Sequence, residues 1–258
     1  MADPSSPPGE LASDPGRRDR GRREPGRRDP GRREPGRRGR EAVAEHRQLR
    51  YVPPPGAATL LLVRHGESAP FREDEPPPLL GGASDPELDP VGVEQAARLA
   101  ERLGGEDLAA IYVTPLRRTA QTAAPLAARL GLEPRVEPDL REVFLGDWEG
   151  GLYRKHVREA HPIALRLREV GRWDVIPGAE PAAEFAGRVR AGIARIAAAH
   201  PGERVVVVVH GGVIGQALAL AAGSRPLAFA WADNGSISEL VVLDDLWTVR
   251  SYNDTAHL

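Results

Sequence analysis

The chain contains no cysteine and only one lysine, Lys155, in 258 residues. The absence of cysteine excludes disulfides, thiolate metal sites and a thiol nucleophile, and it fits a reducing compartment. Long apolar runs are also absent, because the longest ones have the length of a strand, whereas a membrane-spanning helix needs about 20 apolar residues. The amino terminus lacks the apolar segment of a signal peptide and carries acids among its arginines, so we expect a soluble, cytoplasmic protein.

Residues 14–38 repeat a five-residue unit, DPGRR, DRGRR, EPGRR, DPGRR and EPGRR. The Pro-Gly pairs oppose regular structure, the side chains offer nothing to bury, and the period is far too short for a solenoid. We therefore expect residues 1–56 to be a disordered tail. Its excess of arginine over acids permits weak nonspecific contact with nucleic acid, but a solvated extension is favoured. Residues 57–258 have a globular composition and predict one folded domain.

Two apolar runs, Leu60 to Val63 and Val205 to Val209, each end at a His-Gly pair. Continuous leucine or β-branched runs are typical of strands covered on both faces, which indicates a parallel sheet. Further strands are predicted at 109–113, 237–243 and 247–252, and helices at 90–105, 114–131, 181–199 and 212–222, with a helical insertion from 151 to about 180. This alternation predicts a three-layer α/β/α sandwich with a mostly parallel central sheet.

Two of the predicted helices have specific features. The helix from Pro90 has an apolar stripe through Val93, Ala97 and Ala100, which predicts its buried face. In the second helix, Thr114 is the expected N-cap and Pro115 the expected first helical residue.

Charged side chains follow the two central strands. The carboxyl ends of parallel strands meet at one edge of a sheet, so we expect His65 and His210 to lie together, with Arg64 beside the first. Gly66 is expected to permit the turn after the first strand, and Gly211 with Gly212 to open a helix whose amino terminus favours an anion. A third cation is predicted at the strand-to-helix junction TPLRRTAQT, where Arg117 and Arg118 lie in the first helical turn and Arg118 is favoured as the inward side chain.

Four ordered stretches, LVRHGES, TPLRRTAQTA, LREVFLGDWEG and VVHGGVI, resemble the histidine phosphatase superfamily, also called the phosphoglycerate mutase-like family, over about residues 58–258. The resemblance implies a phosphohistidine on His65, formed by attack of a neutral imidazole on phosphorus. It implies that the side chains of Arg64, Arg118 and His210 hold the phosphoryl oxygens. Substrate contacts are also expected from Ser68 and Gly211.

The resemblance also implies that Glu142 protonates the leaving oxygen and later deprotonates water. Glu149 and Asp147 are alternatives for that role. No cofactor or metal is expected, because the Arg64 guanidinium next to His65 disfavours a divalent ion. Structural or surface roles are expected for the other histidines, namely His46, His156, His161, His200 and His257.

The sequence departs from the family at Phe71, where many members have an asparagine that donates to the phosphate. The acidic, proline-rich segment 72–89 is expected to form a flap over the pocket. The insertion carries Arg154, Lys155, His156 and Arg158, which permits contact with a second anionic group. It is too short to resemble the mutases, so hydrolysis of small phosphorylated metabolites is favoured. The alternatives are a bisphosphoglycerate-dependent phosphoglycerate mutase and a non-catalytic phosphate-ester-binding protein, and a monomer or homodimer is expected.

Overall fold

The structure is a computed structural model that describes residues 45–258. Most of the predicted disordered tail, residues 1–44, lies outside the described residues. Residues 45–54 form no helix or strand and are exposed. Regular structure begins with strand β1 (Ala58–Arg64), next to the predicted start of the folded domain.

A central sheet is built from β1 and five further strands: β4 (Ala110–Val113), β5 (Arg135–Val136), β6 (Arg204–Val209), β7 (Ile237–Leu243) and β8 (Leu246–Asp254). The strand order is β5-β4-β6-β1-β7-β8. The first four strands in this order pair in parallel, whereas β7 pairs antiparallel with its two neighbours, β1 and β8. The predicted mostly parallel sheet is therefore confirmed, and the two strands that end at a His-Gly pair, β1 and β6, are direct neighbours.

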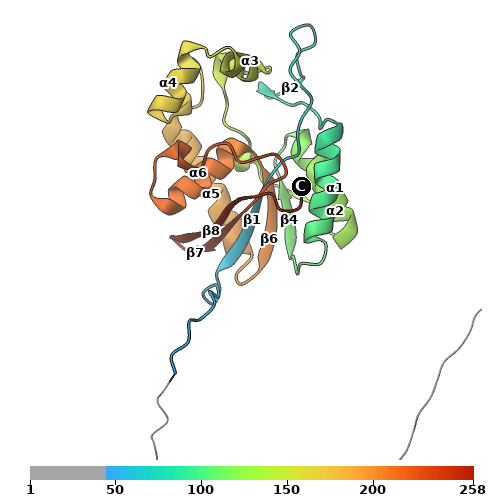
Figure 1. Ribbon diagram of the computed structural model, residues 1–258, viewed down its shortest axis with the longest axis vertical. Coiled ribbons are helices and arrows are strands. Elements are labelled where there is room, and N and C mark those ends of the chain that lie inside the picture. Colours follow the sequence, from blue (N-terminus) through green and yellow to red (C-terminus); the bar gives the residue numbers. More distant parts are fainter. Residues whose placement is uncertain (1–44) are drawn as a thin grey trace, which may run out of the picture. The chain divides into compact units, whose positions relative to one another are not determined.

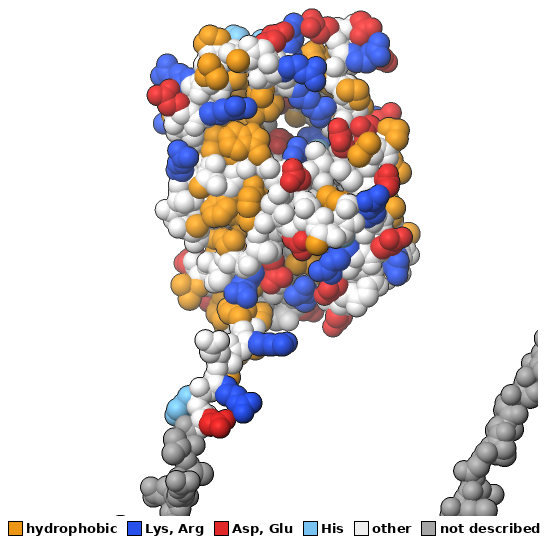
Figure 2. Space-filling model, in the orientation of Figure 1, with side chains coloured by type: hydrophobic (Ala, Val, Ile, Leu, Met, Phe, Trp, Pro, Cys, Tyr) orange, Lys and Arg blue, Asp and Glu red, His pale blue; other side chains and the backbone are white. Residues whose placement is uncertain are grey.

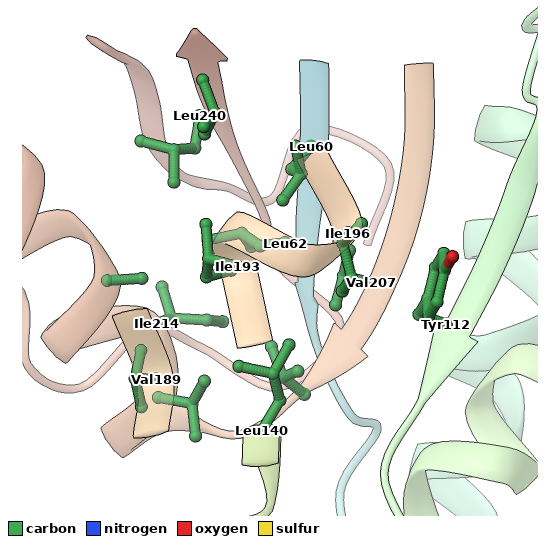
Figure 3. Close-up of a cluster of buried hydrophobic side chains, with 14 of the residues drawn as sticks. Leu60, Leu62, Tyr112, Leu140, Val189, Ile193, Ile196, Val207, Ile214 and Leu240 are labelled. Carbon is green, nitrogen blue, oxygen red and sulfur yellow. The ribbon is translucent and has the colours of Figure 1, made fainter. Parts of the chain in front are cut away.

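Helices cover both faces of this sheet (Figure 1): α1 (Pro90–Leu103) and α2 (Arg117–Leu130) on one side, α5 (Ala182–Ala199) and α6 (Gly211–Ala222) on the other. Successive residues of a strand point to opposite faces. Leu60 and Leu62 accordingly join a core cluster with α5 and α6, drawn in Figure 3, while Leu61 and Val63 join one with α1 and α2. The three-layer sandwich is confirmed, and burial on both faces explains the unbroken apolar runs.

The buried face of α1 differs from the predicted stripe. Val93 is 58% exposed, and Ala97 is exposed as well. Ala100 is buried as predicted, and the other buried residues include Gly92 and Leu99. Gly92 faces inward because a backbone segment packs directly on it: an added Cβ would lie 2.0 Å from the carbonyl oxygen of Glu67. Glycine, which has no side chain, thus occupies the helix position that contacts the loop after β1.

The predicted start of α2 is also wrong. The helix begins at Arg117, its N-cap position is Leu116, and no side chain caps it. The Thr114 hydroxyl has a different partner, the imidazole Nε2 of His210, at 3.0 Å. Thr114 therefore directly follows β4, and its side chain belongs to the carboxyl edge of the sheet rather than to the helix.

The insertion contains α3 (Leu152–Arg158), α4 (Pro162–Val170) and a 3-10 helix at Trp173–Val175. Figure 1 shows α3 and α4 beyond the carboxyl ends of the parallel strands. They pack around a third cluster that includes Trp148, Leu167 and Ile176. Within residues 45–258, no helix is long and apolar enough to cross a bilayer.

Candidate active site

The two His-Gly pairs meet at the carboxyl edge of the sheet. The backbone N–H of His65 donates to the carbonyl oxygen of Val209 at 3.0 Å, which extends the β1–β6 pairing to the histidines. The rings of His65 and His210 lie edge to face, with 5.2 Å between their centroids. Parallel pairing of two neighbouring strands therefore brings together two imidazoles that are far apart in the sequence, as predicted.

The His65 ring is held at both nitrogens. Its Nδ1 lies 2.7 Å from the carbonyl oxygen of Gly66, and its Nε2 lies 3.1 Å from the Nε of Arg118. Because a carbonyl oxygen only accepts and a guanidinium only donates, these partners assign the ring proton to Nδ1 and a lone pair to Nε2. Burial lowers the pKa of His65 well below its ordinary value, and the charges of Arg118 and Arg64 lower it further. The ring is neutral at pH 7.

Arg118 is the inward arginine of the pair. It is 7% exposed, and its Nη1 donates to the carbonyl oxygen of Ser84 at 2.9 Å. Burial lowers the pKa of Arg118 to about 10, against the raising effect of the Glu142 carboxylate, so the guanidinium keeps its charge at neutral pH. Arg117 turns away and pairs with the buried carboxylate of Asp85, at 3.1 Å from its Nε. The side chain favoured by the sequence pattern is the one that reaches His65.

Arg64 lies on the other side of the histidine. Its Nη1 donates to the carbonyl oxygen of Ala232, while its Nε is buried without a hydrogen-bond partner in the described part of the chain. Burial lowers the pKa of Arg64, and the nearby Glu142 carboxylate opposes this effect. A buried N–H donor without a partner is suited to bind an anionic oxygen atom.

His210 lies deeper than the other predicted site residues. It is completely buried, at the N-cap position of α6, with Nε2 on Thr114 and Nδ1 without a partner among the described residues. Burial, followed by the charge of Arg118, lowers the pKa of His210 well below its ordinary value. The second imidazole is therefore neutral too, and its Nδ1 has no hydrogen-bond partner among the described residues.

Glu142 contacts the amino terminus of α6. Its two carboxylate oxygens accept the backbone N–H groups of Val143 at 2.9 Å and Gly212 at 3.2 Å. The rival carboxylates are placed differently. Glu149 accepts from the backbone and the hydroxyl of Ser84 at 2.8 and 2.6 Å, which fixes a turn, and Asp147 is exposed. Of the three, Glu142 is the carboxylate whose charge reaches both Arg64 and Arg118.

Gly211 and Gly212 open α6, as predicted, and two of the motif glycines also make close contacts. None of Gly66, Gly211 and Gly212 has a positive φ. An added Cβ at Gly66 would lie 2.5 Å from the carbonyl oxygen of Gly92, and one at Gly212 would lie 2.4 Å from Glu142 Oε1. At Gly211 it would make an ordinary contact of 3.5 Å with the Nε of Arg64. Gly66 thus lets the loop pack on α1, and Gly212 lets the carboxylate reach the helix.

Ser68 and the insertion form a second layer of the site. Ser68 is buried, and its hydroxyl accepts from Arg154 Nη2 at 2.7 Å, while Arg154 Nη1 donates to the carbonyl oxygen of Ala69 at 2.9 Å. Phe71 packs against Gly151, where an added Cβ would lie 2.3 Å from the ring. Arg154 was predicted only as part of a basic insertion, because a lone arginine on a short polar helix resembles any exposed residue.

One cavity joins most of these groups. Its wall includes five of the predicted residues, Arg64, His65, Ser68, Arg118 and Glu142, together with Phe71, whereas His210 and Gly211 do not line it. It also includes aromatic side chains that the sequence pattern did not identify as part of a site, namely Trp148, Tyr153 and Trp173. Figure 2 shows a hollow rimmed by Lys and Arg side chains in the upper part of the domain. Residues 72–89, the predicted flap, contain the short strands β2 (Leu79–Leu80) and β3 (Ala83–Ser84), and Ala83 and Ser84 line the cavity.

The remaining histidines lie outside this cavity. His200 is buried between the Tyr112 hydroxyl at 3.0 Å and the Glu203 carboxylate at 2.6 Å. His156 and His161 pack on Trp148. Across residues 45–258, the structure contains no group of three or more His, Cys, Asp or Glu side chains that could hold a metal ion.

Comparison with known proteins supports the sequence resemblance. A sequence model of the histidine phosphatase superfamily (branch 1) matches residues 60–255. The chain belongs to the histidine phosphatase superfamily. The matched range begins in β1 and ends after β8, so it spans the whole central sheet of this histidine phosphatase fold.

Several relatives are named after an activity. Phosphoglycerate mutase-like protein 4 of Arabidopsis thaliana is 36% identical over 208 residues, which cover 78% of this chain and 87% of that protein. The metal-independent phosphoserine phosphatase of Arabidopsis thaliana is 34% identical over 203 residues, which cover 77% and 82%. A native structure of a mycobacterial glucosyl-3-phosphoglycerate phosphatase aligns with a TM-score of 0.65 at 29% identity, over 77% of this chain and all of that one (100%). The histidine phosphatases similar to this chain thus include phosphatases of small metabolites.

Proposed function

We propose that the protein is a metal-independent phosphomonoesterase of the acid phosphatase type, which hydrolyses small phosphorylated metabolites through a phosphohistidine on His65. The observation that carries this proposal is the orientation of the His65 ring, with Nδ1 facing a carbonyl oxygen and Nε2 facing a guanidinium. That orientation leaves a lone pair on Nε2, inside a cavity whose wall carries the guanidiniums of Arg64, Arg118 and Arg154. A neutral imidazole between fixed positive charges is suited to attack a phosphoryl group.

In the first step, Nε2 of His65 attacks phosphorus in line with the leaving oxygen. A P–N bond forms, the P–O bond to the leaving group breaks, and the positive charge that develops on the ring is stabilised by the Gly66 carbonyl oxygen at Nδ1. Arg64 and Arg118 hold the nonbridging oxygens, because planar guanidiniums match phosphate geometry and stay charged. Arg118 exchanges its contact with Nε2 for a contact with a phosphoryl oxygen as the substrate enters.

Glu142 handles the protons. In its protonated form it gives a proton to the leaving oxygen, which departs as an alcohol. In the second step the same carboxylate takes a proton from water, the water oxygen attacks phosphorus, and the P–N bond breaks to release phosphate and neutral His65. The position of Glu142 near Arg64, Arg118 and the amino terminus of α6 supports this role.

The test is hydrolysis of p-nitrophenyl phosphate by the full chain, with and without EDTA. We expect activity that EDTA leaves unchanged and that His65→Ala abolishes, with the exposed His46→Ala as the matched control. Activity that survives in His65→Ala refutes the nucleophile, and loss of activity in EDTA refutes metal independence. Conversion of 3- to 2-phosphoglycerate in the presence of bisphosphoglycerate identifies a mutase instead, and tight binding of phosphate esters without turnover identifies a binding protein.

A further inference from the structure

Thr114 is a buried residue of the site edge to which no role has been given so far. It directly follows β4, the strand next to β6, and is 2% exposed. Its hydroxyl lies 3.0 Å from Nε2 of His210. The same oxygen accepts the backbone N–H of Leu116 at 3.3 Å and lies 3.2 Å from the Thr119 hydroxyl. Among the described residues, this hydroxyl is therefore the one hydrogen-bond partner of the His210 ring.

Two proton arrangements satisfy this network in the empty site. In the first, the Thr114 hydroxyl donates to Nε2 of His210, and the ring proton lies on Nδ1. In the second, Nε2–H donates to Thr114, the Thr114 hydroxyl donates to Thr119, and Nδ1 carries a lone pair. The Thr119 hydroxyl fits either one, because the carbonyl oxygens of Thr114 and Leu116, at 3.1 and 2.8 Å, take its own proton.

A phosphoryl group distinguishes the two arrangements. Nδ1 of His210 and Nε of Arg64 are both buried, both lack a partner among residues 45–258, and belong to residues at the ends of the neighbouring strands β6 and β1. In the first arrangement, Nδ1–H of His210 can donate to a phosphoryl oxygen. In the second, Nδ1 presents a lone pair to that oxygen, which repels it. The His210 ring that carries this donor is a direct neighbour of the attacking imidazole, with 5.2 Å between the two ring centroids.

We propose that Thr114 is a positioning residue: its hydroxyl donates to Nε2 of His210 and thereby holds the ring proton on Nδ1, where it faces a phosphoryl oxygen. This inference rests on the proposed phosphatase function.

The test compares Thr114→Val, which keeps the shape and removes the hydroxyl, with Thr114→Ser, which keeps the hydroxyl. Thr119→Val is the matched control, since it removes a buried hydroxyl of the same turn that does not touch the imidazole. The readouts are kcat/KM for p-nitrophenyl phosphate, the inhibition constant for vanadate, and the His210 tautomer. The tautomer is read from nitrogen NMR shifts of the vanadate complex with labelled histidine, with the His210 signals assigned by their loss in His210→Gln.

We expect Thr114→Val to lower kcat/KM and weaken vanadate binding by about 10- to 100-fold, whereas Thr114→Ser and Thr119→Val stay within about threefold. We expect an Nδ1–H tautomer of His210 in the vanadate complexes of the wild type, Thr114→Ser and Thr119→Val. Unchanged kinetics in Thr114→Val overturn the proposal, and so does an Nε2–H tautomer in the wild-type complex, a measurement that needs no variant to fold. If the wild type neither hydrolyses esters nor binds vanadate, the proposed function itself is wrong and this inference falls with it.

Discussion

Lowering the pH is expected to destabilise the fold through its two site histidines. In the folded chain, burial and neighbouring guanidiniums keep the pKa values of His65 and His210 well below the ordinary value, so both rings stay neutral as the pH falls. In the unfolded chain the same rings bind protons with a pKa of about 6.5. The unfolded state therefore gains protons that the folded state does not, and stability is lost as the pH falls through this value.

The size of the effect follows from proton linkage. At pH 5.5, one unit below the ordinary histidine pKa, each ring of this kind lowers the free energy of unfolding by about 1.4 kcal/mol relative to its high-pH limit. The two rings together lower it by about 2.8 kcal/mol, which is a large part of the 5–15 kcal/mol of a typical domain. At pH 7.5 the combined effect is only about 0.1 kcal/mol.

The assay is urea unfolding followed by tryptophan fluorescence at pH 7.5 and 5.5 in buffer without phosphate. The wild type is compared with His65→Asn and His210→Asn, whose amides do not titrate. Other groups contribute equally to all chains, so each variant should lose about 1.4 kcal/mol less than the wild type between the two pH values. The exposed His46→Asn should lose as much as the wild type. The reasoning fails if the site variants and the wild type lose the same amount, because the folded rings would then be protonated.

The other expected outcomes concern catalysis of ester hydrolysis. Arg118→Ala should lower kcat by about 10²- to 10³-fold, whereas Arg117→Ala should change it by less than about tenfold, because only Arg118 reaches His65; equal losses would contradict this placement. Gly212→Ala should lower kcat by at least about tenfold with little change in far-UV circular dichroism, because its methyl group displaces the Glu142 carboxylate; a normal rate would show that this contact is dispensable. Glu142→Gln should lower the rate by about 10²-fold, because an amide neither donates a proton to the leaving oxygen nor takes one from water; a rate equal to that of the wild type would remove Glu142 from its role.

The sheet and the meeting of the two histidines were predictable because they depend on rules that act at the level of whole strands. Unbroken apolar runs require helices on both faces, and parallel neighbours bring their carboxyl ends together. The gathering of His65, His210 and Arg118 follows from this topology with few further assumptions. The choice of Arg118 over Arg117 came from pattern similarity, and its physical reason, the buried Asp85 that holds Arg117, lies in a segment expected only to be a flap.

Other details depended on contacts that no local pattern contains. The stripe of α1 was misplaced because Gly92 does not count as apolar, although backbone packing on Glu67 makes it the innermost residue of its turn. Thr114 resembled an N-cap because threonine before proline is typical of one, but its hydroxyl is bound to His210 from another strand. Arg154 resembled a surface cation because its partners, Ser68 and Ala69, are about 85 positions away in the chain.

The carbonyl oxygen of Gly66 has a chemical consequence for any covalent intermediate. With the ring proton on Nδ1, only Nε2 has a lone pair, so we expect any phosphohistidine on His65 to be the τ isomer and not the π isomer. A backbone atom of the motif loop, which no substitution of a side chain removes, thus sets the regiochemistry of the enzyme.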